Sequence, residues 1–270
     1  MSTIVLSTAE RKRFAKCPVK CPRLHDRIES LADYVAVISS AITTNERFWF
    51  RGHKDFLFSL TPSALRYSEF SDRTRALELI SDFKRIAAYK VPHQVNPDNE
   101  LEWALIAQHN GLPTRLLDWT ESGTTALYFA CLADDHDGMV FVLNPVALNR
   151  MSYPGKPRVL DPQRDKEVII TYLRMGGKNI PGGRLPVAID PVWNSDRLVI
   201  QKGVFTLHGS RFDLDGAKVP SLVAIPILRE YKVKLRSELE RIGVDEMTLF
   251  PELEHLCAHL TRRAGLERYK

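Results

Sequence analysis

Helical and strand-like hydrophobic patterns are interleaved along this chain without the regular strand–helix–strand alternation of a parallel α/β sheet. Apolar residues recur at helical spacing in several segments, and short β-branched or aromatic runs lie between them. The helical segments are 25–43, 72–89, 99–111, 121–133, 165–174, 229–242 and 250–263, and the strand segments are 47–51, 139–143, 204–207 and 222–227. Residues 114–119 are expected to be an extended or turning segment. This mixture predicts an α+β fold, a single large domain in which several helices surround a small sheet.

Loops and domain boundaries follow from proline, glycine and charge. Residues 144–164 and 176–195 are rich in proline or glycine, which predicts irregular loops. Residues 1–24 are basic and interrupted by proline, which predicts a flexible arm ahead of a domain at 25–265. Such an arm is either a solvated terminus or a contact for a polyanion.

Size and composition are those of an ordinary globular protein. The chain has 270 residues, of which 44% are hydrophobic and 26% charged, with a formal net charge of +5. Its apolar runs, such as 126–133, are far shorter than the roughly 20 residues that span a bilayer. We therefore expect a cytoplasmic protein that does not associate with a membrane. The small positive charge permits nucleic-acid binding without requiring it.

An arginine and a glycine end an aromatic strand pattern. Residues 47–51 read RFWFR and are followed by Gly52 and His53. The guanidinium of Arg51 is a planar fork that suits phosphate or carboxylate. Gly52 lets the chain turn or lets a ligand approach closely. Alternatively, Arg51 pairs with an acidic side chain and Gly52 is only a turn.

A second polar cluster joins the end of one predicted helix to the start of the next. It lies within residues 107–121 and contains Gln108, His109, Asn110, Thr114, Arg115, Asp118, Trp119, Thr120 and Glu121. Loops held between rigid elements often carry sites. Arg115 is positioned to pair with Asp118, and Asp118 to orient His109 at the helix end that favours imidazolium. Alternatively, the cluster is a polar network that only fixes a tight turn between two helices.

Metal-binding patterns are incomplete in this sequence. Cys17, Cys21 and His25 supply three ligands, whereas a structural zinc site needs four. His255 and His259 lack the acidic residue of an HExxH motif. We therefore expect no metal. The GxSxG motif is also absent, which argues against an α/β-hydrolase.

Both polar segments resemble motifs of the FRG-domain family. Phe50, Arg51 and Gly52 match the motif that gives the family its name, and residues 108–120 with 126–130 resemble its longer central motif. Two later segments also look like family motifs; they are 201–206 and 249–253. The resemblance covers most of the chain and implies an FRG-type domain. It does not imply a reaction, because the family name records a motif.

The order of the predicted elements is also similar to that of Arg-Ser-Glu ADP-ribosyltransferases. This similarity implies that Arg51 grips the phosphates of NAD and that Thr114 lies near the nicotinamide pocket. Those enzymes carry a catalytic glutamate on a late strand, whereas the late strand here starts with Gln201, Lys202 and Gly203. An acid is needed to stabilise an oxocarbenium-like centre. Either Asp118 or Glu121 serves instead, or the domain binds without catalysing.

Three functions are compatible with these residues. The first is a nucleotide-dependent transferase, with NAD as its substrate, that acts on a nucleic acid or protein as a toxin or antiviral-defence effector. The second is a nucleic-acid-binding or nuclease-like module, and the third is a non-catalytic interaction domain. For the first function the expected catalytic residues are His109, Asp118 and Glu121, and the expected nucleotide-binding residues are Arg51, Gly52, Thr114, Arg115, Trp119 and Gln201.

If the two polar segments form one site, Arg51 must lie beside His109 or Asp118. We expect Arg51 to bind a ligand and to contribute little to stability. We expect Asp118 to be a buried carboxylate, paired either with Arg115 or with backbone N–H groups at the start of the 121–133 helix. Its replacement is expected to lower stability. Glu121 would then be the better general base.

Overall fold

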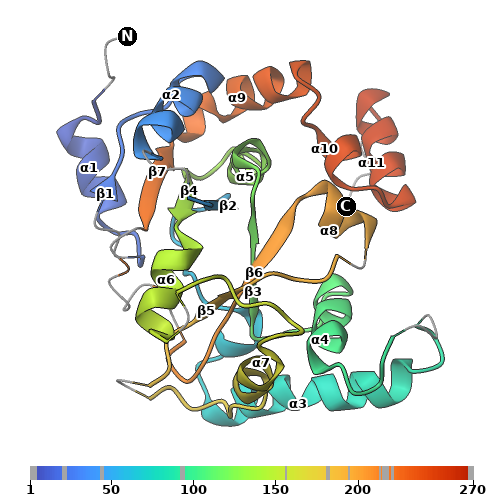
Figure 1. Cartoon of the computed structure of the whole chain (residues 1–270). Helices are drawn as coiled ribbons and strands as arrows, with labels where there is room; N and C mark the ends of the chain where they lie inside the picture. The colour runs from blue at the N-terminus through green and yellow to red at the C-terminus, as the bar shows by residue number, and fades with distance from the viewer. Residues whose placement is uncertain are drawn as a thin grey trace.

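A sheet of seven strands crosses the computed structural model of this chain (Figure 1). The strand order is β1-β7-β4-β2-β3-β6-β5; β1 is parallel to β7, and the other neighbours are antiparallel. The strands are β1 (Arg23–Leu24), β2 (Trp49–His53), β3 (Leu116–Thr120), β4 (Gly138–Leu143), β5 (Val187–Ile189), β6 (Gly203–Leu207) and β7 (Val223–Ile227). The structure describes residues 5–19, 23–42, 46–91, 95–155, 157–180, 183–193, 195–212, 214, 219 and 222–266.

Helices connect the strands and cover both faces of the sheet. They are α1 (Thr8–Phe14), α2 (Leu31–Ala41), the 3-10 helix η1 (Ser63–Leu65), α3 (Phe70–Ala87), α4 (Glu100–His109), α5 (Gly123–Ala130), α6 (Pro145–Ser152), α7 (Lys166–Leu173), α8 (Asp196–Ile200), α9 (Arg229–Arg241), α10 (Glu246–Leu249) and α11 (Leu253–Arg263). The prediction of a single α+β domain is confirmed. None of the described helices is both long and apolar enough to cross a bilayer.

Two of the predicted loops contain regular elements. Helix α6 lies at the start of the loop predicted for 144–164, where Asn144 caps the helix and Pro145 takes its first position. Strand β5 lies within 176–195 and has three residues, too few for an alternating pattern to show. The last helix begins at Leu253 rather than at residue 250, because Phe250 caps the end of α10 and Pro251 lies in the short connection that follows.

Three hydrophobic clusters divide the two faces of the sheet. One face carries a cluster that includes Trp49, Leu117 and Phe141. The opposite face carries two clusters: α2, α5 and α9 pack over β2, β4 and β7, whereas α4 and α7 pack over β3, β5 and β6. Figure 1 shows α2 and α9 above α5, and α4 and α7 in the lower part of the molecule. The boundary between the two clusters therefore lies over β2 and β3.

The ladder between the two central strands is short. Strand β2 pairs with β4 from Trp49 to His53, but it pairs with β3 only where Phe50 faces Thr120. Strand β3 pairs along its whole length with β6 instead. Beyond Phe50, a gap therefore separates the end of β2 from the start of β3.

A close approach of α5 to β2 explains the glycine at position 52. A Cβ atom there would lie 1.9 Å from the carbonyl oxygen of Ala126 and 2.7 Å from the backbone nitrogen of Ala130. Both atoms belong to the backbone of α5, so the helix rests directly on the strand. Gly52 thus serves helix packing as well as bordering the gap.

The N-terminal segment differs from the flexible arm predicted for residues 1–24. Ser7 and Glu10 form a capping box at the start of α1. Leu6 and Phe14 are buried in the core cluster, and the Phe14 ring lies 5.2 Å from that of Phe56. Only a few apolar residues anchor this segment in the core, and their spacing is irregular. The sequence pattern therefore reflects the basic residues and does not predict the burial. The domain boundaries at 25 and 265 stay a prediction.

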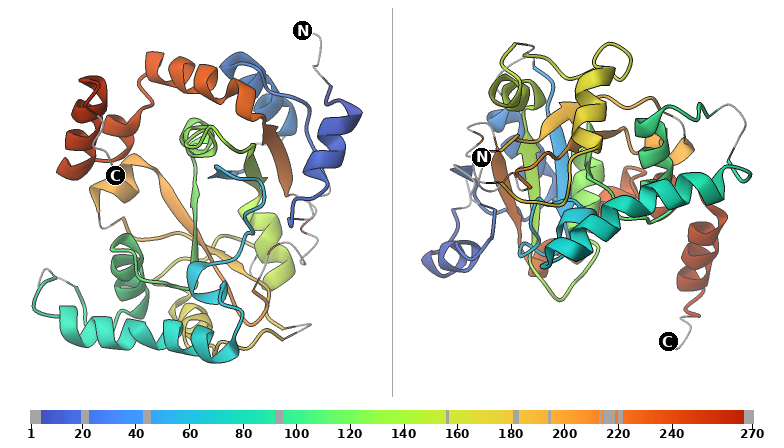
Figure 2. Two further views of the ribbon diagram at one scale, coloured as in Figure 1. Left: turned by 180° about the vertical axis from the view of Figure 1, so that it is seen from behind. Right: turned by 90° about the horizontal axis from the view of Figure 1, so that it is seen from below.

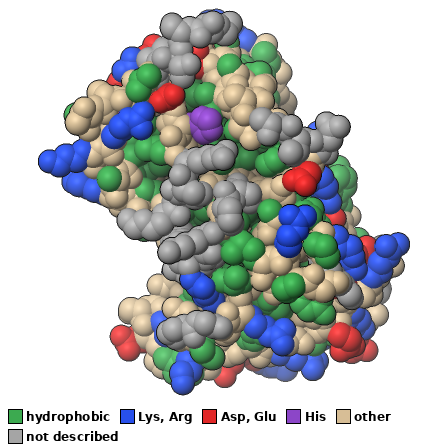
Figure 3. Space-filling model, turned by 60° about the vertical axis from the view of Figure 1, so that its left-hand side comes forward, with side chains coloured by type: hydrophobic (Ala, Val, Ile, Leu, Met, Phe, Trp, Pro, Cys, Tyr) green, Lys and Arg blue, Asp and Glu red, His purple; other side chains and the backbone are tan. Residues whose placement is uncertain are grey.

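Two arginines of this segment are paired with acidic side chains. Arg13 Nε lies 3.0 Å from the buried Asp137 carboxylate, and Arg11 Nη2 lies 3.2 Å from Asp26. Figure 3 brings the left-hand side of Figure 1 forward and shows Lys and Arg side chains in separate groups rather than in one continuous basic patch. The charge of the arm is therefore partly neutralised within the protein.

The carboxyl-terminal end of the chain extends away from the sheet. Helix α11 packs mainly against α10, and it projects from the body of the molecule in the right-hand view of Figure 2. Its Leu253 and Leu260 side chains are exposed. The sheet and its packed helices therefore form without a large contribution from α11.

The first prediction concerns Gly52. Gly52→Ala is expected to destabilise the protein by about 3 kcal/mol or more, because backbone atoms of α5 cannot move aside as a flexible side chain would. Gly155→Ala is the matched control, since nothing lies within 4 Å of a Cβ at that position. Thermal melting of both variants checks the prediction. Similar melting temperatures would contradict the close approach.

The second prediction concerns the N-terminal segment. Phe14→Ala is expected to lower the free energy of unfolding by about 3–5 kcal/mol, the usual cost of emptying a buried phenylalanine site. Val5→Ala, at a side chain that is 61% exposed, is the control and is expected to have little effect. Urea unfolding measures both. If Phe14→Ala unfolds like the wild type, the segment is an arm and not part of the core.

Candidate ligand-binding site

A cavity of about 720 Å³ opens between α4, α5 and α8, over the gap between β2 and β3. Six of the nine expected site residues line it; they are Arg51, Gly52, His109, Asp118, Trp119 and Gln201. Thr114, Arg115 and Glu121 are not among its lining residues. The two polar segments therefore meet at one cavity, as the shared-site hypothesis requires.

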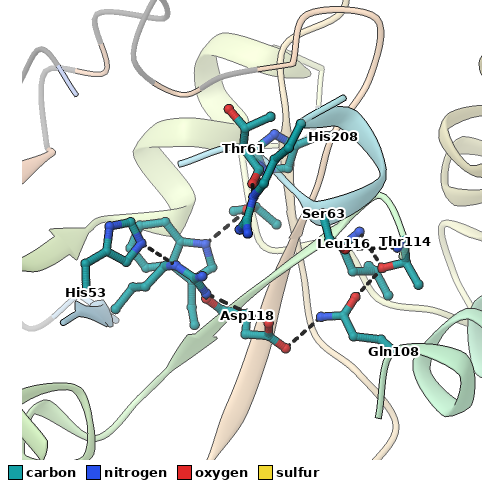
Figure 4. A network of polar contacts seen from close by, with 12 residues as sticks. His53, Thr61, Ser63, Gln108, Thr114, Leu116, Asp118 and His208 are labelled. Atoms are coloured by element: carbon teal, nitrogen blue, oxygen red, sulfur yellow. Dashed lines mark hydrogen bonds and ion pairs between the residues drawn. The ribbon is translucent and has the colours of Figure 1, made fainter. Parts of the chain in front are cut away.

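Arg51 lies in the gap between the two central strands. Its Nη1 donates to the backbone carbonyl of Asp118, which β2 leaves unpaired, and its Nε donates to His53 Nε2 at 2.9 Å. Nη1 also lies 3.8 Å from Asp118 Oδ2. Figure 4 shows this network of polar contacts around His53 and Asp118. Arg51 therefore has structural contacts, as in the alternative in which it pairs with an acidic residue, and it also lines the cavity.

Burial sets the electrostatics of Arg51. Its side chain is 17% exposed, and loss of solvent lowers its pKa to about 10. The nearby Asp118 carboxylate opposes this shift, while the Arg66 guanidinium adds to it. A guanidinium that has lost much of its hydration and has one carboxylate nearby gains from an additional anion.

Asp118 is exposed to the cavity and not buried as expected. Its side chain is 63% exposed. Gln108 Nε2 donates to Asp118 Oδ1 at 2.7 Å, and Gln108 Oε1 accepts from the hydroxyl of Thr114. Asp118 thus has one carboxylate oxygen bound by an amide, and the other lies near Arg51.

The expected pair between Arg115 and Asp118 is wrong. Arg115 is buried and donates to four backbone carbonyls, which belong to Met175, Gly176, His208 and Gly209. Burial lowers its pKa to about 10. Arg115 therefore ties the end of β6 to the segment after α7, and it is not a phosphate ligand of this cavity.

Thr114 and Trp119 also have structural contacts. Thr114 Oγ1 accepts from the N–H of Leu116 at 3.1 Å, in addition to its bond with Gln108. The Trp119 ring packs in the core cluster on the other face of the sheet, and its Nε1 donates to Thr206 Oγ1 at 3.0 Å. The Trp119 ring is therefore not free to stack on a ligand.

Glu121 belongs to an ion-pair network at the edge of the sheet. Arg47 Nε donates to Glu121 at 2.9 Å, and the same guanidinium donates to both oxygens of Asp190 at 2.8 Å. The structure places Glu121 outside the cavity lining, which weakens its expected role as general base. Asp118 is the expected acid that does line the cavity.

Two expected residues line the cavity from the helices around it. His109 lies in the last turn of α4. Gln201 follows α8, and its Nε2 donates to the carbonyl of Leu249 at 2.9 Å. The bond to Leu249 uses one of the two N–H groups of the Gln201 amide and links the end of α8 to the end of α10.

Sequence reasoning missed two residues beside Asp118. Gln108 belongs to the polar cluster, but the neighbouring His109 is the expected catalytic residue because its imidazole can transfer a proton. Arg66 follows η1 in a segment without a clear pattern; it interacts electrostatically with both Arg51 and Asp118. No sequence signal marks Arg66, since its proximity to β3 depends on the long-range fold.

A metal is not indicated by the side chains that the structure describes. No three His, Cys, Asp or Glu side chains among the described residues are grouped as metal ligands would be. Cys21 of the incomplete pattern lies outside the described residues. The charged residues that line the cavity are Arg51, Lys90, Arg197, Glu102 and Asp118, and neutral polar groups lie between them.

Comparison with protein families assigns the central part of the chain. The model of the FRG domain matches residues 46–138. The chain contains an FRG domain. The match spans β2 to the start of β4 and so includes the Arg51 and Gln108–Thr120 segments. No curated protein and no solved structure matches the chain.

Two histidines of the FRG-domain protein are buried as neutral imidazoles. His208 Nδ1 must donate to the Phe212 carbonyl, because a carbonyl only accepts, so His208 Nε2 accepts from the Thr206 hydroxyl at 2.9 Å. Burial lowers the pKa of His208 to about 3. Burial, together with Arg51 and Arg66, also holds the pKa of His53 well below its usual value.

The third prediction is therefore acid sensitivity. The unfolded chain takes up a proton on each histidine near pH 6.5, while folded His208 resists until about pH 3. Stability is expected to fall as pH drops through this window, by up to about 1.4 kcal/mol per pH unit for each histidine. Urea unfolding at neutral and acidic pH measures the slope. His208→Asn should flatten it, whereas His136→Gln, at an exposed ring, should not.

Proposed function

We propose that this FRG-domain protein is a nucleotide-dependent transferase with NAD as its substrate. The observation that carries the proposal is the meeting of Arg51 and Asp118 at a cavity of about 720 Å³. This volume is within the range of about 300–1,000 Å³ that is usual for small-molecule sites. The ligand groups that this pair suits are a phosphate and a centre of developing positive charge.

Arg51 is the candidate phosphate-binding group. Burial removes water from its guanidinium and lowers its pKa to about 10. A phosphate would stabilise the charged guanidinium in place of that water. Arg66 adds a second positive charge near Asp118. Phe50, Phe129 and Phe205 line the same cavity and offer apolar surface for a nucleotide base.

Asp118 is the candidate acid in place of the glutamate that the late strand lacks. In the proposed reaction, the bond from the ribose C1′ to nicotinamide breaks, and its electron pair leaves with nicotinamide. The acceptor forms the new bond to C1′, and the acceptor's proton passes to Asp118 Oδ2. An exposed carboxylate that faces the cavity is suited to stabilise the positive charge on C1′ and to take this proton. The acceptor would be a protein or nucleic acid, as in a toxin or a defence effector.

A non-catalytic interaction domain is the second candidate. The structural contacts of Thr114, Arg115 and Trp119 favour it, since these motif residues hold the fold. A nucleic-acid or nuclease-like module has less support, because Arg11 and Arg13 of the basic segment are paired and His53 is buried. NAD consumption separates the first two candidates.

The fourth prediction compares two acids. Asp118→Asn is expected to abolish nicotinamide release from NAD and to leave melting nearly unchanged, because the side chain is largely exposed. Glu121→Gln is the control: it should retain activity and lose at most about 1 kcal/mol of stability from its surface ion pair.

Purified protein is assayed for nicotinamide release with and without added protein and nucleic acid. Activity that survives Asp118→Asn would transfer the catalytic role to another acid. No NAD binding and no nicotinamide release under any of these conditions would sink the transferase and leave the interaction domain.

A further inference from the structure

We propose that Gln108 is the positioning residue that fixes the carboxylate of Asp118 toward the cavity, with Thr114 fixing Gln108 in turn. This inference rests on the proposed function, because positioning matters only if Asp118 contacts a ligand. It concerns a side chain that the expected set of site residues does not include. Figure 4 shows Thr114, Gln108 and Asp118 as a connected row.

The direction of these hydrogen bonds is set by the groups that take part. Asp118 Oδ1 lies 2.7 Å from the Gln108 amide and, as a carboxylate oxygen, needs a donor. The amide nitrogen of Gln108 must therefore face Asp118, and its oxygen must face Thr114. The Thr114 hydroxyl already accepts from the Leu116 N–H, so its own proton is available for Gln108 Oε1.

This arrangement gives the two oxygens of the Asp118 carboxylate different surroundings. Gln108 holds Oδ1, which restricts rotation of the carboxylate plane. Oδ2 lies 3.8 Å from Arg51 Nη1, and the side chain as a whole is 63% exposed. Oδ2 is therefore the oxygen left to contact a ligand, at a distance from Arg51 that allows both groups to bind the same molecule.

Thr114 anchors the row to the rigid part of the fold. It is buried, its backbone N–H donates to Ser63 Oγ at 3.2 Å, and it immediately precedes Arg115 and β3. Gln108 lies in the last turn of α4. The row thus connects α4 to β3 across the cavity edge, so the orientation of Asp118 depends on how these two elements pack.

The kinetic test uses matched pairs of variants. Gln108→Leu removes both hydrogen bonds and is expected to lower kcat by about 10- to 100-fold with little change in KM, since a misoriented group slows the chemical step more than it weakens binding. Gln163→Leu, at an exposed position, is the control for the same replacement. Thr114→Ser keeps the hydroxyl and should keep kcat near the wild-type value. Thr114→Val removes the hydroxyl and should lower kcat as Gln108→Leu does.

Gln108→Glu gives a readout that a merely structural role would not change. It places a second carboxylate beside Asp118, so the two groups share a proton, and the acidic limb of the pH–rate profile should move to higher pH. Gln108→Leu adds no charge and should leave the position of that limb unchanged. An unmoved limb in Gln108→Glu, or an unchanged kcat in Gln108→Leu, overturns the inference.

A spectroscopic readout separates this inference from the transferase proposal. The side-chain amide signals of Gln108 are followed by NMR in the wild type, in Asp118→Asn and in Thr114→Val. Both variants are expected to shift these signals. Absence of a shift overturns the positioning role even if NAD is consumed. A clear shift in a protein that neither binds nor consumes NAD overturns the transferase proposal, and with it the positioning of Asp118 for NAD.

Discussion

Strands β2 and β3 pair at one position, Phe50 with Thr120, and the Arg51 side chain fills the gap beyond it. The guanidinium donates a hydrogen bond to a carbonyl of β3 that the neighbouring strand does not pair. A buried carbonyl without a hydrogen-bond partner would lower the stability of the fold. The same gap brings Arg51 near the carboxylate of Asp118. One residue therefore bridges the two central strands and also brings a positive charge to the cavity beside Asp118. The helices on either side of this gap belong to two separate hydrophobic clusters, so the cavity lies at their boundary.

Buried cations in this protein are satisfied mainly by backbone carbonyls. Arg115 binds four of them, and Lys232 Nζ donates to those of Lys54 and Ala133 at 2.8 and 2.7 Å. Such charge-assisted bonds fix loop conformations that have no strand partner. Arg51 differs from these two residues, because it lines the cavity. This difference distinguishes the candidate site from the structural use of the same chemistry elsewhere in the chain.

Strand geometry explains why some sequence predictions about the site are wrong. Arg115 and Asp118 are three positions apart, a spacing that suits a pair on a helix but places two residues on opposite faces of a strand. Because residues 116–120 form β3, Arg115 turns toward the carbonyls after β6 while Asp118 faces the cavity. Glu121 lies just beyond the strand and meets Arg47 across the sheet. The motif thus identifies the segment that carries the site, and the backbone conformation decides which of its side chains reach the cavity.

The sequence by itself determined what depends on local periodicity and chemistry. Hydrophobic spacing predicted the α+β mixture, and the two motif segments marked the FRG domain and its candidate site. Only the tertiary structure decided which polar groups meet: Arg51 with Asp118, Arg47 with Glu121, and Arg13 with Asp137. These contacts join residues far apart in the chain, and they depend on strand register and on which hydrophobic face each helix buries. A local sequence pattern determines neither the strand register nor the buried face of each helix, because the free energy that selects them comes from the packing of the whole sheet.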